Sequence, residues 1–194
     1  PSGAFADAAV LSVLEQLGMR IVITRSAVVQ SAQTIEELAS SGAAGARHRS
    51  VALLRFINLR LDSLPTDGEE PVAVAQDEGF LASMSRLSWL PVLQASPHPQ
   101  LPWVARSVGV ASPEAVRPSA DTWLVSHCMG VLEGDLASEA LRESFGWSQP
   151  PRPAVVCAQL IQFAKNYDAA SAPSEDFLWE HLLRPAYTHM MALA

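Results

Sequence analysis

Cysteine, long hydrophobic runs and clustered positive charge are all scarce in this chain. Two cysteines in 194 residues, Cys128 and Cys157, cannot form the disulfide framework of a small secreted domain, which favours a reducing setting. No apolar run reaches the roughly 18 residues that a membrane-spanning helix needs, and no basic stretch followed by an apolar one marks a signal peptide. We therefore expect a cytoplasmic protein without a membrane span.

Positive charge is also too sparse for a nucleic-acid partner. The chain carries 13 Lys and Arg against 20 Asp and Glu, for a net charge of −7. Its densest basic spot is Arg47 with Arg49, and the solvation of a helix accounts for that pair. Such a surface cannot neutralise a phosphate backbone, so the sequence predicts no nucleic-acid binding.

The composition is that of a folded chain. Hydrophobic residues make up 49% and charged residues 17%, which excludes a disordered protein. The length suffices for one domain or two small ones. The chain begins at Pro1 without a methionine, which predicts either a fragment of a longer protein or a processed one.

Motifs that would carry chemistry are missing. No phosphate-binding glycine loop and no nucleophile elbow occurs. His127, Cys128 and Cys157 lack the spacing of zinc ligands, so we expect both cysteines to be small buried apolar residues. The sequence therefore predicts a non-enzymatic protein with no metal, no cofactor and no catalytic residue.

A cysteine-dependent enzyme is the alternative that the residues leave open. Cys128 or Cys157 could be the nucleophile, with His98 as the base and Asp121 as the carboxylate that orients it. No local motif supports this arrangement. A small hydrolase or transferase is thus the competing hypothesis.

Apolar residues recur at intervals of three and four over most of the chain, which is the spacing of amphipathic helices. Thr24 and Ser174 stand where helices begin, and Pro185 is expected to kink the last one. The inward face of the second segment comprises Val28, Ala32, Ile35 and Ala39, and that of the third comprises Val51, Leu54, Ile57, Leu61 and Leu64. The predicted helices cover residues 5–17, 25–39, 51–64, 69–86, 138–147, 153–167 and 174–190.

A small β-ribbon is predicted between residues 104 and 131. Val108 and Val110 alternate with small residues, as in a short strand. The partner strand would come from three further residues, Trp123, Val125 and Val131.

The fold class that follows is mainly α: a multi-helical domain with a small β-ribbon in the middle. Pro91 interrupts the apolar run 88–93, which excludes a central strand there. Residues 1–66 form an N-terminal helical cluster, and residues 67–194 form a segment rich in Trp and Pro with the ribbon and the C-terminal helices. One continuous domain is the alternative division.

Residues 87–147 hold four of the five tryptophans. Large aromatic side chains among prolines either fill an irregular core or line a groove for an extended ligand. The core role is favoured, because loop-rich segments need such anchors to be ordered. The groove hypothesis assigns a candidate interaction surface to four residues, Trp89, Pro91, Pro102 and Trp103.

A series of short apolar and proline motifs extends over nearly the whole chain. In the second half these are WLPVL at 89–93, LPW at 101–103, ASPEAV at 111–116, FGW at 145–147, QPP at 149–151, VV at 155–156 and QL at 159–160. In the first half they are LGM at 17–19, the segment 32–35 and the Leu pair at 53–54. Together they resemble the helical part of the large repeats of sacsin-family co-chaperones.

The resemblance implies a segment that follows an ATP-site domain in a cytoplasmic protein-quality-control machine. The family also carries a J-type module that recruits the DnaK-type chaperone. No ATP-site signature occurs here, and His98-Pro99-Gln100 departs from the His-Pro-Asp signature of the J-type module at Gln100.

The resemblance therefore implies a non-enzymatic scaffold or interaction segment that acts in protein quality control and cytoskeletal organisation. Its partners would be neighbouring chaperone domains or client segments. A regulatory domain for a neighbouring ATPase is a further alternative, and the sequence leaves the oligomeric state open.

Overall fold

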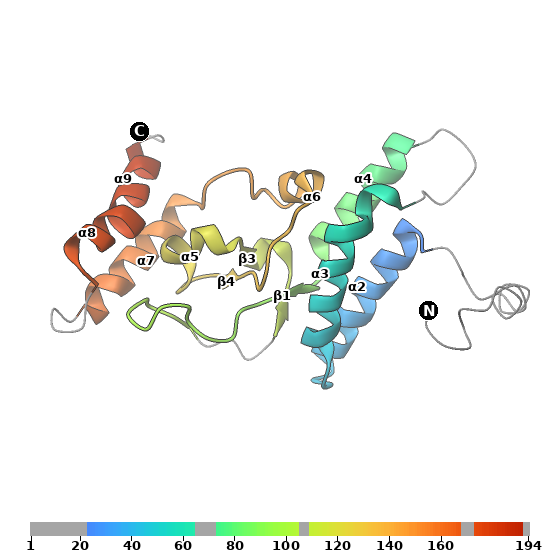
Figure 1. The fold of residues 1–194 in the computed structure, drawn as a ribbon, viewed down its shortest axis with the longest axis horizontal. Helices are drawn as coiled ribbons and strands as arrows, with labels where there is room; N and C mark the ends of the chain where they lie inside the picture. The colour runs from blue at the N-terminus through green and yellow to red at the C-terminus, as the bar shows by residue number, and fades with distance from the viewer. Residues whose placement is uncertain (1–22, 65–72, 105–108, 168–172, 192–194) are drawn as a thin grey trace, which may run out of the picture.

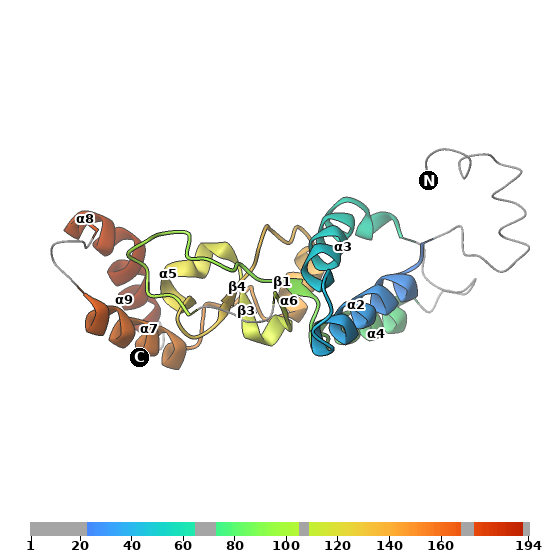
Figure 2. The ribbon, with the colours of Figure 1, turned by 90° about the horizontal axis from the view of Figure 1, so that it is seen from below.

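A computed structural model describes residues 23–64, 73–104, 109–167 and 173–191 of the chain. The predicted fold class, mainly α with a minor β component, is confirmed. The helices are α2 (Arg25–Ser40), α3 (Ala46–Arg60), α4 (Ala73–Arg86), α5 (Thr122–Val125), α6 (Glu139–Ser144), α7 (Pro153–Asn166), α8 (Glu175–Leu178) and α9 (Arg184–Met191). The molecule is elongated, with α2, α3 and α4 at one end, a loop-rich centre, and α7, α8 and α9 at the other end (Figures 1 and 2).

Helix α2 forms as its apolar pattern predicts. Thr24 precedes it in an extended conformation, and Val28, Ala32 and Ile35 are buried. Gly42 follows it with a φ of 68°, a left-handed conformation that glycine adopts without strain. Helices α2 and α3 pack against each other, so the buried face of α2 is one wall of the core.

Helix α3 begins earlier than the predicted 51–64 segment, because the polar residues at 47–50 carry no periodic apolar signal. Leu54, Ile57 and Leu61 are buried, as predicted, whereas Val51 and Leu64 are half-buried. The helix predicted over residues 5–17 lies outside the described residues, as does the part of the fourth predicted helix that precedes α4.

Two pairs of two-residue strands cross the centre of the molecule. The antiparallel pair is β1 (Leu90–Pro91) with β2 (Val110–Ala111), and the parallel pair is β3 (Val116–Arg117) with β4 (Gly130–Val131). Short paired strands therefore exist in this region, as predicted, but the predicted partners of each strand were wrong. Trp123 and Val125 lie in α5, because an apolar segment of four residues fits a helix as well as a strand. Val108 lies outside the described residues.

Pro91 lies in a strand, but its sheet has only the two strands β1 and β2, so the exclusion of a central strand at Pro91 is not contradicted. Beyond its pairing with β2, the β1 segment also borders residues 131–133, through an isolated bridge between Val92 and Leu132. The Pro91 carbonyl accepts from the Glu133 N–H at 2.9 Å. A proline removes only the hydrogen bond that its own nitrogen would donate, and a two-residue strand tolerates that loss.

One hydrophobic core crosses the predicted boundary between residues 66 and 67. It joins Ile35 and Ile57 on one side to Met84, Trp89 and Leu141 on the other. Helix α4 packs on both α2 and α6. The packing therefore does not divide at residues 66 and 67.

The last helix begins at Ser174, whose Oγ accepts from the Phe177 N–H at 3.3 Å. Upstream of Pro185 the structure contains a π turn, Trp179–Leu183, between α8 and α9. A proline lacks an N–H and crowds the carbonyl four residues before it. A widened turn just upstream accommodates both effects.

Candidate functional site

Trp89 and Pro91, half of the predicted interaction surface, belong to the core. Both are buried, and Trp89 is 0% exposed. The indole Nε1–H of Trp89 donates to the Met84 carbonyl at 2.9 Å, and the Ser50 hydroxyl donates to the Trp89 carbonyl. The assignment of these two residues to an interaction surface was therefore wrong: they pack in the core, because the apolar run 88–93 lies against α3.

Pro102 and Trp103 lie together at a pocket of about 570 Å³. One wall is the proline-rich loop at 96–103, and the other is the C-terminal end of α7, which the loop passes in Figure 1. The residues that line this Trp103 pocket are Ser96, Pro99, Gln100, Leu101, Pro102, Trp103, Phe163, Asn166, Tyr167 and Pro173. Its volume lies within the range of about 300–1,000 Å³ that is typical of ligand sites.

A buried chain of hydrogen bonds holds the loop against α7. The Pro102 carbonyl accepts from the Ser126 hydroxyl at 2.8 Å, and that hydroxyl oxygen accepts from Gln159 Nε2 at 3.1 Å. Gln159 Oε1 accepts from the His127 N–H at 2.7 Å. Gln159 is 0% exposed and lies one turn before Phe163, so it joins the two walls of the pocket.

The sequence analysis did not identify Gln159 as a structural residue; it appears there only in the QL motif at 159–160. It does leave a signal: a polar residue between Val156 and Phe163, at spacings of three and four, faces the same way as they do. A polar side chain at a buried helical position must have hydrogen-bond partners. That rule identifies Gln159 as a buried anchor, without identifying Ser126 as its partner.

Replacing Gln159 by leucine is expected to lower the free energy of unfolding by about 1–3 kcal/mol, because the His127 N–H and the Ser126 hydroxyl lose a partner inside the protein. Urea denaturation measures the loss. The matched control is Gln33→Leu on α2, where Gln33 is exposed and the same substitution should leave stability within about 0.5 kcal/mol. Equal stability of the two variants would refute the anchoring role.

The indole nitrogen of the half-buried Trp103 differs from those of the buried Trp89 and Trp147. Trp89 and Trp147 donate their Nε1–H groups to the carbonyls of Met84 and Pro113, at 2.9 and 3.4 Å. Among the described residues, Trp103 Nε1 is buried and has no acceptor. An unpartnered buried donor costs about 1–3 kcal/mol, so it needs a physical reason.

An aromatic cluster fixes the other side of the same loop. The His98 ring stacks on Phe177, with centroids 5.6 Å apart, and lies 5.2 Å from the Trp123 ring. The Phe177 ring is also 4.1 Å from His181. The loop at 96–103 is thereby fastened to α5 and α8 as well as to α7.

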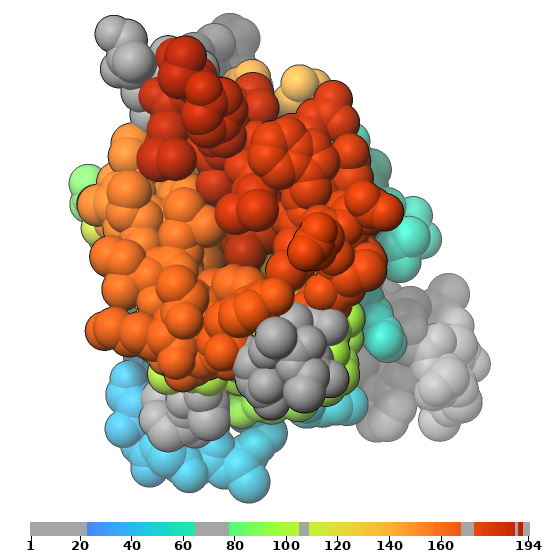
Figure 3. Space-filling model, turned by 90° about the vertical axis from the view of Figure 1, so that its left-hand side faces the viewer, coloured from blue at the N-terminus to red at the C-terminus, as the bar shows by residue number. Residues whose placement is uncertain are grey.

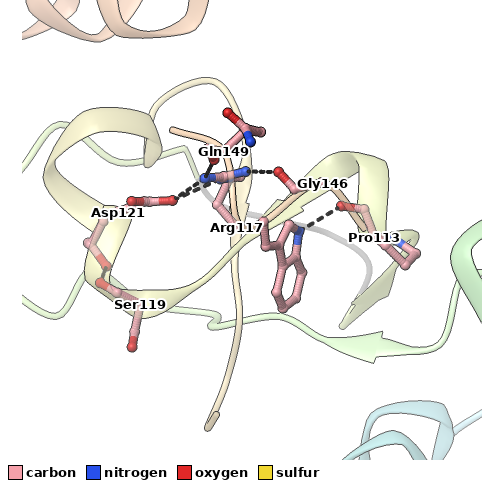
Figure 4. Close-up of polar contacts among 8 residues, drawn as sticks. Pro113, Arg117, Ser119, Asp121, Gly146 and Gln149 are labelled. Atoms are coloured by element: carbon pink, nitrogen blue, oxygen red, sulfur yellow. Dashed lines mark hydrogen bonds and ion pairs between the residues drawn. The ribbon is translucent and has the colours of Figure 1, made fainter. Parts of the chain in front are cut away.

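A second buried polar centre surrounds Arg117 at the middle of the molecule (Figure 4). Its guanidinium is 2.7 Å from Asp121 Oδ2. It also donates to the carbonyls of Gly146 and Gln149, at 3.2 and 2.7 Å. These contacts tie the loop that follows α6 to the segment 117–121.

The expected burial of the cysteines was wrong: Cys128 and Cys157 are both exposed. Cys157 follows the buried Val156 on α7 and faces outward. Asp121 is engaged by Arg117, and the His98 ring is packed on Phe177, so both partners of the cysteine hypothesis have other contacts. No group of three or more His, Cys, Asp or Glu in the described part of the chain could hold a metal ion.

Exposed large apolar side chains gather at the end of the molecule formed by α7, α8 and α9, the end that faces the viewer in Figure 3. Of nine such residues in the described ranges, seven lie there; Ile23 and Leu59 lie elsewhere. The five on the last helix, which we call the C-terminal apolar row, are Trp179, Leu183, Tyr187, Met190 and Met191.

This row runs beside the buried face of the same helix. Each of three exposed residues directly follows a buried one: Trp179 after Leu178, Leu183 after Leu182 and Tyr187 after Ala186. Consecutive helical residues are about 100° apart. One face therefore packs inward on α5 and α7, and the adjacent face presents aromatic and aliphatic groups to solvent.

No protein-family model, curated protein or solved structure matches this chain. Within the described ranges, no helix combines the length and the apolar character needed to cross a bilayer. The Trp103 pocket and the C-terminal apolar row are therefore the features from which a function can be argued.

Proposed function

We propose that the chain is a non-enzymatic interaction segment of a sacsin-like co-chaperone, and that its C-terminal apolar row binds protein partners. It acts in cytoplasmic protein quality control and cytoskeletal organisation. The partners are neighbouring chaperone domains or client segments, and no cofactor takes part. The observation that supports this function is the concentration of exposed apolar residues on one end of the molecule.

The composition of the row suits a protein interface. Trp, Tyr and Met are enriched at the centres of interfaces, and the flexible Met side chain adapts to partners of different shape. Glu180 and Arg184, paired at 3.0 Å, lie directly beside Trp179 and Leu183 along the helix and supply the polar rim that interfaces have. Contiguous exposed apolar surface of this kind marks sites of association.

A binding experiment tests the proposal with an unfolded client as the probe. A reduced and alkylated, permanently unfolded protein carrying a fluorescent label is titrated with the 194-residue chain, and anisotropy reports binding. We expect the triple variant Trp179→Ser, Leu183→Ser, Tyr187→Ser to bind at least about tenfold more weakly, since such aromatic anchors each contribute more than about 1 kcal/mol.

The control is Leu59→Ser. Leu59 is 79% exposed on α3, at the opposite end of the molecule (Figure 1), and its substitution should leave the affinity unchanged. Circular dichroism confirms that all variants fold. Equal binding by the triple variant and the parent chain would contradict the role of the row, and no binding of any client at high concentration would contradict the proposed function.

A further inference from the structure

An apolar groove runs between α2 and α3, at the end of the molecule opposite the C-terminal apolar row (Figure 1). Its volume is about 490 Å³, and seven of the ten described residues that line it are apolar. Val28, Ile35 and Leu53 form its buried floor. Among the described residues, only α2, α3 and the residue Ile23 contribute to the lining, so an apolar surface of the kind that proteins usually cover is left open.

The groove begins where the described part of the chain begins. Ile23 lines one end of it and is 50% exposed. The segment before Ile23 carries the helix predicted over residues 5–17, which lies outside the described residues. Its apolar residues recur every four positions, at Phe5, Ala9, Val13 and Leu17, as on one face of an amphipathic helix. Such a face needs an apolar partner, and the chain leads from it directly into the groove.

The lengths of the segment and the groove agree. Residues 18–24 connect the predicted helix to α2, and this link is within the range of about two to eight residues that usually joins antiparallel helices. Along α2 the groove extends from Ala27 to Ile35, a rise of about 12 Å in an α-helix. A helix over residues 5–17 would be about 20 Å long. An antiparallel neighbour of α2 therefore covers the groove from end to end.

The charges favour the same direction. Arg49 lines the groove and is exposed. It lies in the first turn of α3, close to the loop that joins α2 to α3 and thus at the end of the groove far from Ile23. Asp7 lies in the first turn of the predicted helix, which the antiparallel direction brings to that same end. Opposite charges at matching positions fix the register of a docked element.

We infer that residues 5–17 of this chain form a helix that docks antiparallel to α2 in the groove between α2 and α3, with Phe5, Ala9, Val13 and Leu17 facing its apolar floor. The groove is thus an internal docking site, in the manner of an amphipathic helix that lays its apolar face into a groove. The inference is independent of the proposed function, because the C-terminal apolar row belongs to the last helix at the opposite end (Figure 1).

Thiol labelling of the full chain provides the test. Cys128 and Cys157, both exposed, are first replaced by serine. A single cysteine is then introduced by Ala52→Cys, at an exposed position in the groove, or by Arg55→Cys, at an exposed position of α3 outside it. We expect a bulky maleimide to react at least about tenfold more slowly with Ala52→Cys, because the docked helix must open before the reagent reaches the thiol.

Two adjacent alanines supply a matched pair of variants. Ala9 lies on the apolar face of the predicted helix, whereas Ala8 lies outside that face, since consecutive helical residues are about 100° apart. Ala9→Asp would place a charge in the apolar groove, so we expect it to raise the labelling rate of Ala52→Cys about tenfold, to that of Arg55→Cys. Ala8→Asp makes the same substitution on the side facing water and should leave the protection in place.

The outcomes separate this inference from the proposed function. Equal labelling of Ala52→Cys and Arg55→Cys in the otherwise unchanged chain would overturn the docking, and this comparison does not depend on whether Ala9→Asp folds. Equal effects of Ala8→Asp and Ala9→Asp would also overturn it. Protection that rises with protein concentration would identify a second copy as the source of the helix and overturn the internal site. Protection of Ala52→Cys without any binding of the unfolded client would contradict the proposed function and support the docked helix.

Discussion

Replacing Trp89 by alanine is expected to lower the free energy of unfolding by about 3–5 kcal/mol, the range for truncating a large buried aromatic side chain. Trp89 is 0% exposed. Its ring meets Phe145 edge-on with centroids 6.4 Å apart, and its Nε1–H bonds to Met84. The substitution would open a cavity where α4, α3 and the segment after α6 meet, and would leave the Met84 carbonyl without its donor.

Because a domain is stable by only about 5–15 kcal/mol in total, Trp89→Ala should lose a large fraction of the free energy of unfolding. Urea denaturation followed by circular dichroism measures the loss. Trp179→Ala is the matched control: the same substitution at a side chain that is 52% exposed should change stability by less than about 0.5 kcal/mol. A loss below about 1 kcal/mol for Trp89→Ala would contradict its place in the core.

The long helices could be predicted because their periodicity extends over several turns. In α2 the spacing indicates Val28, Ala32, Ile35 and Ala39, of which the first three are buried and Ala39 is half-buried. At Ser174 a side-chain hydroxyl accepts from an N–H three residues on, as in a helix cap. These features depend on neighbours within one or two turns, which a sequence pattern contains.

The strands could not be predicted in the same way. Leu90 pairs with Ala111 and Val116 pairs with Gly130, and each strand is two residues long, too short to show a period of two. The partner of such a short strand is decided by packing on α3 and by the loops that bring the two strands together. The Trp123 segment formed a helix for the same reason: no local preference outweighed its tertiary contacts.

The candidate site was half predictable. Trp89 and Trp103 both stand beside leucine or proline, yet Trp89 is in the core and Trp103 lines a pocket. Nothing within a few residues of either one distinguishes them. The difference comes from the opposite wall of the pocket, which is formed by Phe163 on α7 and by Tyr167 just after it. These residues lie far along the chain and meet the loop only after the molecule has folded.

The partners of Arg117 could not be predicted from the sequence either, because they also come from segments far along the chain. Replacing it by methionine is expected to cost about 3 kcal/mol, at the lower end of the 3–5 kcal/mol typical of breaking a buried ion pair. The Arg117 side chain is 9% exposed and Asp121 is 21% exposed, so the stranded carboxylate keeps some access to water. The carbonyls of Gly146 and Gln149 lose a charged donor at the same time.

Chemical denaturation again measures the loss, with Arg184→Met as the control. Arg184 pairs with Glu180 at 3.0 Å, but both side chains are more than half exposed, so its removal should cost less than about 1 kcal/mol. The double variant Arg117→Met, Asp121→Leu should recover part of the lost stability, because no uncompensated charge remains. Additive losses in the double variant would show that Arg117 acts only through the two carbonyls, and a loss equal to that of Arg184→Met would show that the centre does not hold the loops together.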